Sequence, residues 1–514
     1  MSVRTSIVTA ISAGAFVCAA ALPAHADIEV IDRGGFRLNV SLQAMIGGFS
    51  VSRTDFGVGN LDTNGVRRRN NRNWGEAFVK PGINGEYQIP GDYGSFYFGV
   101  SVISSTSFGT GDAISSLAPQ ALRSTTTNEP SWTAIEDGFG GWRSGNLFSS
   151  LGSNAIDVSG GYQSFTVGDG LVIGDGTADG WGRAAYYLAP RTAFHDTAIL
   201  RVDPSALAPV RATVFHLATN TNQARMVNND QAQARLVGGT LEWYLAAPQV
   251  AGQPPVPDVW RVTGMYFNIY DADSNPALCF SNAAGCTAPA LTANRDGLNV
   301  ASLRAGGSFF PQNRDILTFG EFVYQWNSDT GRRVRAYAWY LEGGYRFSTV
   351  MWSPTLTYRY AQFSGDSTPG DGTDRSYDPL FFGSGLRAAG PGTWYLGEIY
   401  GQYLGPPSNL NVHQVHLRAS PTDTLNVGLI YYLADFNKPG QYGVSRSGAF
   451  HEIDVYAEWA PRPWLSVTPT FGAAIPRGGY RDIAQASVTA NALPASTRTD
   501  RTIYLVQAVI GVKF

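Results

Sequence analysis

Apolar and polar residues alternate along most of this chain, and the alternation is clearest at its C-terminal end. In residues 501–514 every second position is apolar or aromatic: Tyr504, Val506, Ala508, Ile510, Val512 and Phe514. A period of two residues is typical of a β-strand with one apolar face. Taken alone, such a strand also fits a soluble β-sandwich. A strand at the end of the chain needs neighbours on both edges, so the rest of the sequence has to supply them.

The same alternation predicts eighteen strands. Most of the predicted segments are longer than the roughly 5–6 residues of strands in soluble sheets, and they suit a tilted membrane strand of roughly 9–11 residues. We expect an all-β fold with strands at 35–46, 74–89, 94–105, 134–145, 154–167, 195–203, 209–219, 235–246, 258–270, 297–309, 314–326, 333–347, 350–363, 411–419, 424–434, 449–460, 464–475 and 501–514.

Short and long connections alternate between these strands. The segments 420–423 and 460–463 are short, whereas 169–194, 271–296, 436–448 and 476–500 are long. Short periplasmic turns and long extracellular loops are typical of outer-membrane β-barrels. A soluble β-helix or propeller would show a regular repeat length, and none is found. No stretch after residue 26 has the roughly 18–20 consecutive apolar residues of a membrane helix, so a chain that spans a bilayer must do so as a closed barrel.

Residues 393–404 also alternate and would give a nineteenth strand. A single-chain bacterial barrel has an even number of strands, with both termini on the periplasmic side. We therefore assign 393–404 to one long external segment, about 364–408. The predicted fold is an 18-stranded antiparallel transmembrane β-barrel, and whether segment 364–408 gates it stays open.

The N-terminus is typical of a secretory signal peptide. Arg4 precedes an apolar run at 7–22, which Pro23 ends, and Ala24-His25-Ala26 is a small-x-small cleavage site. A membrane-anchoring helix is the alternative, but the apolar run is short. We expect residues 1–26 to direct Sec export and residues 27–514 to form a barrel in a Gram-negative outer membrane, in contact with lipid and lipopolysaccharide.

Composition agrees with many strands and turns, because the chain has 59 Gly, 28 Pro, 27 Phe, 25 Tyr and 12 Trp. The formal net charge of −3 excludes no partner class by itself. Lysine occurs only at Lys80, Lys438 and Lys513. The arginine bias reflects either genomic base composition or bidentate recognition of carboxylates.

Cys279 and Cys286 lie in a loop-like stretch, and an exported chain meets an oxidising compartment. We therefore predict a disulfide between them; a metal pair is the alternative.

Charged residues between apolar alternates should face the lumen, because an Arg or Lys facing lipid at mid-bilayer costs about 2–4 kcal/mol. One interpretation is a mixed ionic network that stiffens the wall, and the other is an arginine ladder that guides an anionic solute. The predicted pore-lining residues are Gln414, His416, Arg418, Arg359, Glu321, Glu342, Arg346, Glu452, Asp454 and Glu458.

Catalytic constellations are not evident in the sequence. The six histidines are scattered, and no Gly-x-Ser-x-Gly or Walker motif occurs. Gly168-Asp169-Gly170 and Gly174-Asp175-Gly176 lack the ligand spacing of a calcium loop and are better interpreted as turns. We therefore predict no enzymatic activity, no cofactor, no metal site and no nucleic-acid partner.

Two stretches resemble the alginate export family of outer-membrane proteins. One is Gly161-Tyr162-Gln163-Ser164-Phe165-Thr166-Val167-Gly168-Asp169-Gly170, followed by Ile173-Gly174; the other is Ser364-Gly365-Asp366 with Tyr377-Asp378-Pro379-Leu380-Phe381. The resemblance implies an 18-stranded monomeric barrel with an arginine-lined pore for a polyuronate. The resemblance adds Tyr162 to the predicted pore-lining residues; this tyrosine stands where the family usually has Arg, so one pore cation is lost.

Three hypotheses for function follow. The first is an outer-membrane channel for passive passage of an anionic or polar solute, with an alginate-like exopolysaccharide in export among the candidates. The second is a substrate-specific uptake porin for small sugars or organic acids. The third is an outer-membrane enzyme or adhesin with a plugged lumen. The sequence leaves the direction of transport open.

Overall fold

The computed structural model describes residues 28–62, 64–119, 131–174, 176, 184–219, 234–245, 260–272, 295–308, 313–329, 332–383 and 396–514. The proposed signal peptide at 1–26 and the Cys279–Cys286 pair lie outside these residues, so both stay predictions.

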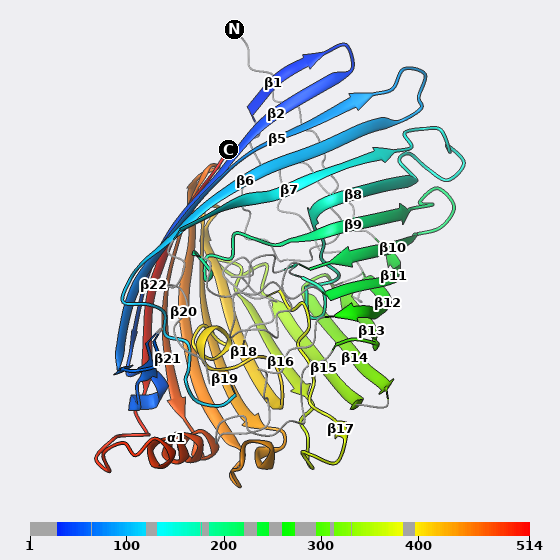
Figure 1. Cartoon of the computed structure of the whole chain (residues 1–514). Coiled ribbons are helices and arrows are strands. Elements are labelled where there is room, and N and C mark those ends of the chain that lie inside the picture. The colour runs from blue at the N-terminus through cyan, green and yellow to red at the C-terminus, as the bar shows by residue number, and fades with distance from the viewer. Residues whose placement is uncertain are drawn as a thin grey trace.

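A single large sheet, antiparallel in all its long strands, dominates the molecule (Figure 1). Its strands are β1 (Ile28–Arg33), β2 (Phe36–Ser52), β5 (Asn71–Gln88), β6 (Ser95–Gly109), β7 (Ser131–Arg143), β8 (Ile156–Ser164), β9 (Ala193–Val202), β10 (Val210–Ala218), β11 (Ala234–Leu245), β12 (Trp260–Ala272), β13 (Leu298–Gly307), β14 (Ile316–Asp329), β15 (Arg332–Arg346), β16 (Thr355–Phe363), β17 (Thr373–Asp374), β18 (Leu410–Thr422), β19 (Leu425–Phe436), β20 (Gly448–Arg462), β21 (Leu465–Pro476) and β22 (Ile503–Lys513).

Smaller elements lie in the connections. They are the two-residue strands β3 (Asn60–Leu61) and β4 (Arg68–Arg69), the short helices η1 (Thr54–Gly57), η3 (Tyr400–Leu404) and η4 (Pro439–Tyr442), and the helix α1 (Gly478–Ala490). None of the helices in the described part of the chain is long and apolar enough to cross a bilayer.

The first and last wall strands pair with each other and close the sheet into a barrel. β2 pairs with β22 on one edge and with β5 on the other, and every other wall strand pairs with its chain neighbours. The sheet holds 20 strands, of which the short β1 and β17 are additions, so 18 strands form the wall. The predicted strand number and antiparallel order are therefore confirmed. β2 runs past its predicted end at 46 to Ser52, because Gly47 and Gly48 interrupt the apolar pattern but not the pairing.

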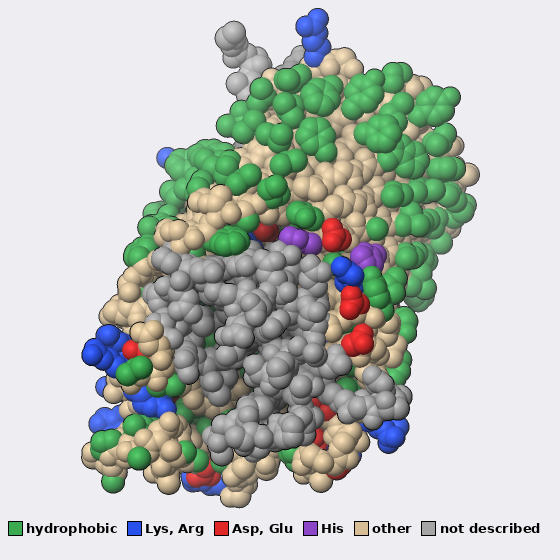
Figure 2. Space-filling view, in the orientation of Figure 1, with side chains coloured by type: hydrophobic (Ala, Val, Ile, Leu, Met, Phe, Trp, Pro, Cys, Tyr) green, Lys and Arg blue, Asp and Glu red, His purple; other side chains and the backbone are tan. Residues whose placement is uncertain are grey.

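The two faces of the wall differ as the alternation predicts. On β22, Val506 and Ile510 are 57% and 44% exposed, whereas Gln507 between them is 3% exposed. Exposed hydrophobic side chains cover the outer wall (Figure 2). A barrel with apolar residues outside and polar residues inside suits hydrocarbon on its outer face. Following the pattern of outer-membrane barrels, we call the end with short turns the periplasmic end and the end with long connections the extracellular end.

The connection between β16 and β18 corrects one expectation. As predicted, it does not add a wall strand, but its described parts are only partly external, because 396–409 is largely buried and 364–366 and 380–382 are buried, whereas 367–372 is exposed. The coil of η3, drawn in yellow, lies inside the barrel in Figure 1. The alternation in this segment has a different cause, because Tyr403 packs on Trp74 and Tyr187, and Tyr400 stacks on Phe450 of the wall.

A hydrophobic core fills the extracellular half of the lumen. It joins wall side chains with residues of η1, α1 and the segments 113–118, 165–173, 184–188, 377–382 and 396–404. The Ala118-Pro119 peptide bond in one of these segments is cis. The connections thus pack the extracellular half of the lumen. The polar inner wall of the periplasmic half lies between them and the short turns.

Candidate functional site

Charged side chains on the inner wall gather at the level of β13–β16. Glu342 of β15 and Arg359 of β16 face each other across the strand pair, and Arg359 Nε lies 2.9 Å from Glu342 Oε2. Both side chains are buried. The Arg359 guanidinium also lies over the ring of Tyr340, with 5.3 Å between its Cζ and the ring centroid. The ion pair therefore fills a fixed place in the wall.

The Gly168-Asp169-Gly170 loop docks on this part of the wall. Asp169 Oδ1 lies 3.3 Å from Arg304 Nε of β13, and the Tyr340 hydroxyl donates to Asp169 Oδ2 at 2.9 Å. Gly168 has a φ of +60°, which favours glycine, and a Cβ here would lie 2.8 Å from Arg304 Cδ. Glu321 is buried nearby and accepts a hydrogen bond from Ser302 Oγ at 2.8 Å. The loop is thus held inside the barrel.

Three of the predicted residues share β18. Gln414 lies opposite Arg359 of β16, and both are buried. His416 Nε2 is hydrogen-bonded to the Tyr456 hydroxyl of β20 at 2.9 Å. Arg418 Nη2 lies 3.1 Å from Glu458 Oε2. These side chains form a continuous polar strip along β16, β18 and β20.

Glu452 and Asp454 of β20 bind the inserted segment around η3. Glu452 accepts the backbone amides of Ile399 and Tyr400 at 2.6 and 3.0 Å, and Asp454 accepts that of Glu398 at 3.0 Å. The Glu398 carboxylate accepts a hydrogen bond from Gln507 of β22 at 3.0 Å, and burial raises its pKa to about 7. These two wall carboxylates therefore contact protein backbone rather than open lumen.

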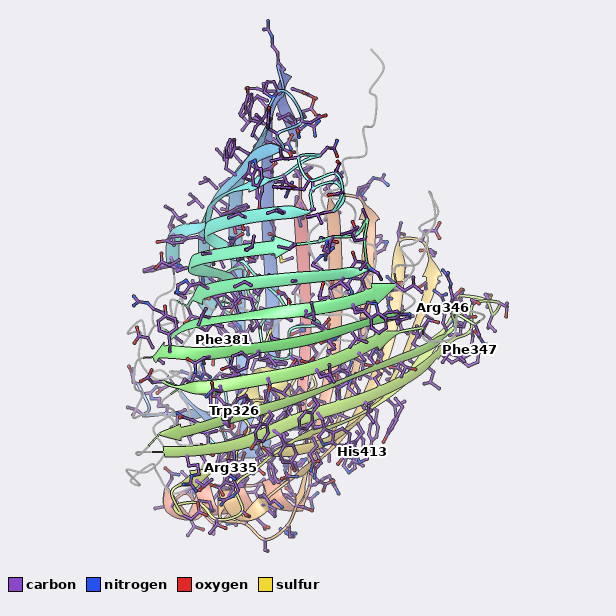
Figure 3. The ribbon with its side chains drawn as sticks, turned by 90° about the vertical axis from the view of Figure 1, so that its right-hand side faces the viewer. Trp326, Arg335, Arg346, Phe347, Phe381 and His413 are labelled. Carbon is purple, nitrogen blue, oxygen red and sulfur yellow. The ribbon has the colours of Figure 1, made fainter. Side chains whose placement is uncertain are left out.

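Two predicted residues lie apart from the others. Arg346 is near the periplasmic end of β15, where its Nε lies 3.0 Å from Asp315 Oδ1; Figure 3 shows it beside Phe347 at that end of the strand. Tyr162 is half-buried and stacks on His195, with ring centroids 4.1 Å apart. Its neighbour Gln163 is buried and bonds Thr197, and the pairing of β8 with β9 is irregular between Gly161 and Gln163.

A second group of charges lines a polar cavity of about 220 Å³ between the Gly-Asp-Gly loop and the periplasmic end. Its lining includes Arg143, Arg201 and Arg211 together with Asp157 and Glu242. Arg143 Nε lies 3.2 Å from Asp157, and Arg211 lies 2.7 Å from Asp203 and 3.6 Å from Glu242. The cavity lining thus holds three arginines and two carboxylates, and Asp203 beside the lining supplies a third carboxylate, paired with Arg211.

Arg201 differs from the other arginines of this cavity. Among the described residues it forms no ion pair with a carboxylate, and its guanidinium lies 6.0 Å from the ring of Phe165. Asp157 stands opposite it across β8 and β9, but the Asp157 oxygens are engaged by Arg143 and the Tyr97 hydroxyl. Sequence reasoning missed this group, although Arg201 between Leu200 and Val202 carries the signal of an inward charge.

Metal chemistry has no evident site in the part of the chain that the structure describes. No group of three or more His, Cys, Asp or Glu side chains there is placed to hold an ion.

Comparison with known proteins gives a family over part of the chain and a fold over nearly all of it. The model of the alginate export family matches residues 266–439. No curated protein sequence matches the chain. Acinetobacter baumannii OccAB3 has a similar fold, with 10% identity, coverage of 92% of this chain and 99% of that one, and a TM-score of 0.50.

Two further solved structures are similar. A BenF-like porin from Pseudomonas fluorescens Pf-5 has 8% identity, covers 93% and 98% of the two chains and has a TM-score of 0.50. Pseudomonas aeruginosa OccK11 (OpdR) has 10% identity, covers 92% and 96%, and has a TM-score of 0.48. The protein is thus a closed 18-stranded barrel with the fold of outer-membrane porins, and the resemblance to the alginate export family is confirmed over residues 266–439.

Proposed function

We propose that the protein is an outer-membrane channel through which an anionic solute passes down its gradient without chemical change. The observation that carries this proposal is Arg201, an inward-facing arginine without a carboxylate partner among the described residues, at the edge of a polar cavity. A fixed positive charge in a narrow, low-dielectric passage raises the local concentration of anions. The porin fold supports the location in an outer membrane.

The two interpretations of the lumen charges apply to different residues. Arg359, Arg418 and Arg304 each face a carboxylate on a neighbouring strand or loop. These pairs support the role of a network that stiffens the wall, because a paired arginine offers little net charge to a solute. Arg201 supports the guiding role. None of the predicted pore-lining residues lines the periplasmic cavity, so we propose Arg201 as the guiding charge in place of the predicted arginine ladder.

An alginate-like polymer in export is the first candidate solute. Its support is the family match over residues 266–439 and the preference of arginine for bidentate contacts with carboxylates. Export would need the packed connections in the extracellular half to move aside, because no polymer passes a close-packed core.

Uptake of a small organic acid is the second candidate. The cavity volume of about 220 Å³ favours it, since this space suits one small acid better than a polysaccharide. In this function the packed connections would act as a selective barrier rather than as a gate for polymers.

Planar-bilayer recordings of the purified protein test the channel. We expect discrete conductance steps and, in a KCl gradient, a reversal potential that indicates anion preference. Arg201→Gln should lower the anion-to-cation permeability ratio at least about twofold, whereas Arg498→Gln, a change in an exposed pair with Asp500, should not. A protein without conductance steps would instead support the enzyme or adhesin hypothesis.

Competition experiments then separate the two solutes. Oligomannuronate that blocks current in Arg201 protein but not in Arg201→Gln protein supports polymer passage. Block by benzoate or a similar small acid, without block by oligomannuronate, supports uptake.

A further inference from the structure

An apolar groove runs across the outer face of β22, β2, β5 and β6. Its floor is made of small residues aligned by strand pairing, since Gly48 lies opposite Ala508 on one side and Gly75 on the other. Val506 and Phe108 form its sides and are 57% and 52% exposed. The groove has a volume of about 460 Å³. Its lipid-facing position means that hydrocarbon chains contact it.

A basic pocket lies at the extracellular end of the same strands. It has a volume of about 640 Å³ and is lined by residues that include Arg67, Arg69, Asn64 and Thr110. The only carboxylate in its lining is that of Asp62, which accepts the backbone amide of Val66 at 3.0 Å. Arg67 and Arg69 are exposed on the hairpin of β3 and β4. Basic side chains also gather at this end of the barrel in Figure 2.

Buried contacts fix the shape of this pocket. Arg72 donates from Nη1 to the Thr110 carbonyl at 2.7 Å, from Nη2 to the Leu61 carbonyl at 2.9 Å and from Nε to Asn60 Oδ1 at 2.8 Å. The hairpin is thereby attached to β5 and β6. The pocket is therefore preformed, and its exposed arginines stand on a braced loop.

The groove and the pocket are continuous. Gly109 lines both of them. Asn73 at the end of the groove and Thr110 in the pocket exchange hydrogen bonds, from Asn73 N to Thr110 Oγ1 at 2.9 Å and from Thr110 N to the Asn73 carbonyl at 2.8 Å. A molecule that occupies both must carry an apolar chain next to an anionic headgroup. The hydrocarbon end points into the membrane and the charged end to the extracellular boundary.

We propose that this composite site binds a phosphorylated glycolipid of the outer leaflet, of the lipid A class. An acyl chain would lie over Gly48 and Gly75, and a headgroup phosphate would accept hydrogen bonds from Arg67 and Arg69. Guanidinium groups bind phosphate through strong, charge-assisted and often bidentate hydrogen bonds. This inference concerns the outer wall and is independent of the solute that passes the lumen.

Two variants address the two halves of the site separately. Arg67→Ala/Arg69→Ala removes the headgroup charges, and its control is Arg446→Ala/Arg498→Ala, two exposed arginines already paired with Asp482 and Asp500. Gly48→Leu fills the groove, because a Cβ at Gly48 meets nothing within 4 Å. Its control is Gly264→Leu on β12, where a Cβ also meets nothing.

The measurement is the binding of fluorescent diphosphoryl lipid A to the purified barrel in detergent, with heat-modifiable mobility as the check on folding. We expect about tenfold weaker binding for Arg67→Ala/Arg69→Ala, as for the loss of one or two charge-assisted contacts. Gly48→Leu should weaken binding by a similar factor because its side chain occupies the space of the acyl chain, and both controls should leave binding unchanged. Dephosphorylated lipid should bind wild type and Arg67→Ala/Arg69→Ala protein equally. Equal binding of diphosphoryl lipid A by site and control variants would overturn the proposal. The proposal would also be overturned if inorganic phosphate or soluble oligomannuronate displaced the fluorescent lipid as strongly as unlabelled diphosphoryl lipid A does.

Discussion

The carboxylate of Glu452 accepts the backbone amide of Ile399, with 2.6 Å between Ile399 N and Glu452 Oε1. Glu452 belongs to the wall strand β20 and Ile399 to the inserted segment before η3. Together with Asp454, this carboxylate receives three consecutive backbone amides, those of residues 398–400. The wall thus holds the insert through its main chain, in addition to the side-chain contacts of Glu398, Tyr400 and Tyr403.

Removal of these acceptors should loosen the extracellular half of the lumen. In Glu452→Ala/Asp454→Ala protein, the three amides of residues 398–400 lose their partners, and each unsatisfied buried donor costs about 1–3 kcal/mol. We expect the mean single-channel conductance to rise severalfold relative to wild type. The control is Glu86→Ala, an inner-wall acid of β5 that bonds Ser95 Oγ at 2.7 Å and has no described contact with the insert. Equal conductance in both variants would show that the insert does not limit the current.

The position of Glu398 predicts that the docking of the insert at residues 396–404 depends on pH. Burial raises the pKa of this carboxyl to about 7, above its ordinary value of 4.5. Because the folded state binds the proton more tightly, the stability that Glu398 contributes is fully present below pH 4.5 and is lost as the pH rises through about 7. The docking of residues 396–404 should therefore weaken between pH 5 and pH 8, and conductance should increase.

Glu398→Gln separates this effect from the other acids that face the insert. Glu452 and Asp454 of β20 and the amide of Gln507 of β22 surround Glu398, so each is retained in the test. The glutamine stays neutral, and conductance should then change little from pH 5 to pH 8. A variant with the wild-type pH profile would assign the titration to other groups.

The strand number could be predicted because a membrane wall imposes its period of two on long segments. The inward direction of Arg359 and Arg418 was predicted for the same reason, since each stands between apolar or aromatic residues, whereas Glu342 was predicted from a weaker pattern, because Gly343 follows it. Whether an inward charge meets a solute or another side chain depends on the neighbouring strand and on the loops. The alternation within one strand indicates neither the register of the neighbouring strand nor the path of the loops. The ion-pair partners could therefore not be predicted.

The inserted segments could not be placed from the sequence. Residues 396–404 contain Leu396, Ile399, Tyr400 and Tyr403, a set equally suited to a strand or to a packed insert. The wall residues Phe450 and Trp74 determine that this segment packs as an insert, because they supply its aromatic contacts. The cavity around Arg201 was missed because glycines such as Gly140, Gly141 and Gly160 weaken the apolar alternation of β7 and β8.

The Arg359–Glu342 pair should contribute strongly to stability. Both side chains are about 5% exposed or less, and removal of one partner from a buried pair typically costs about 3–5 kcal/mol. We expect Arg359→Ala to lower the free energy of unfolding by about this amount in urea titrations of the barrel in detergent. Removal of the exposed Arg498 should cost less than about 1 kcal/mol. The double variant Arg359→Met/Glu342→Leu should be more stable than Arg359→Ala, because it leaves no buried charge unpaired.

Tyr456 fills the space above Gly428 on the inner wall, and this packing predicts that Gly428 cannot be replaced. The two residues lie opposite each other on β19 and β20, and a Cβ at Gly428 would lie 2.2 Å from Tyr456 Cε1. Gly428→Ala must therefore move the ring, which also breaks its hydrogen bond with His416, and overpacking of this kind costs about 1–3 kcal/mol. Gly343→Ala on β15 is the control, because a Cβ there meets nothing within 4 Å. Urea titration should show a loss of that size for Gly428→Ala and little change for Gly343→Ala; equal stability of the two variants would mean that the Tyr456 ring moves freely.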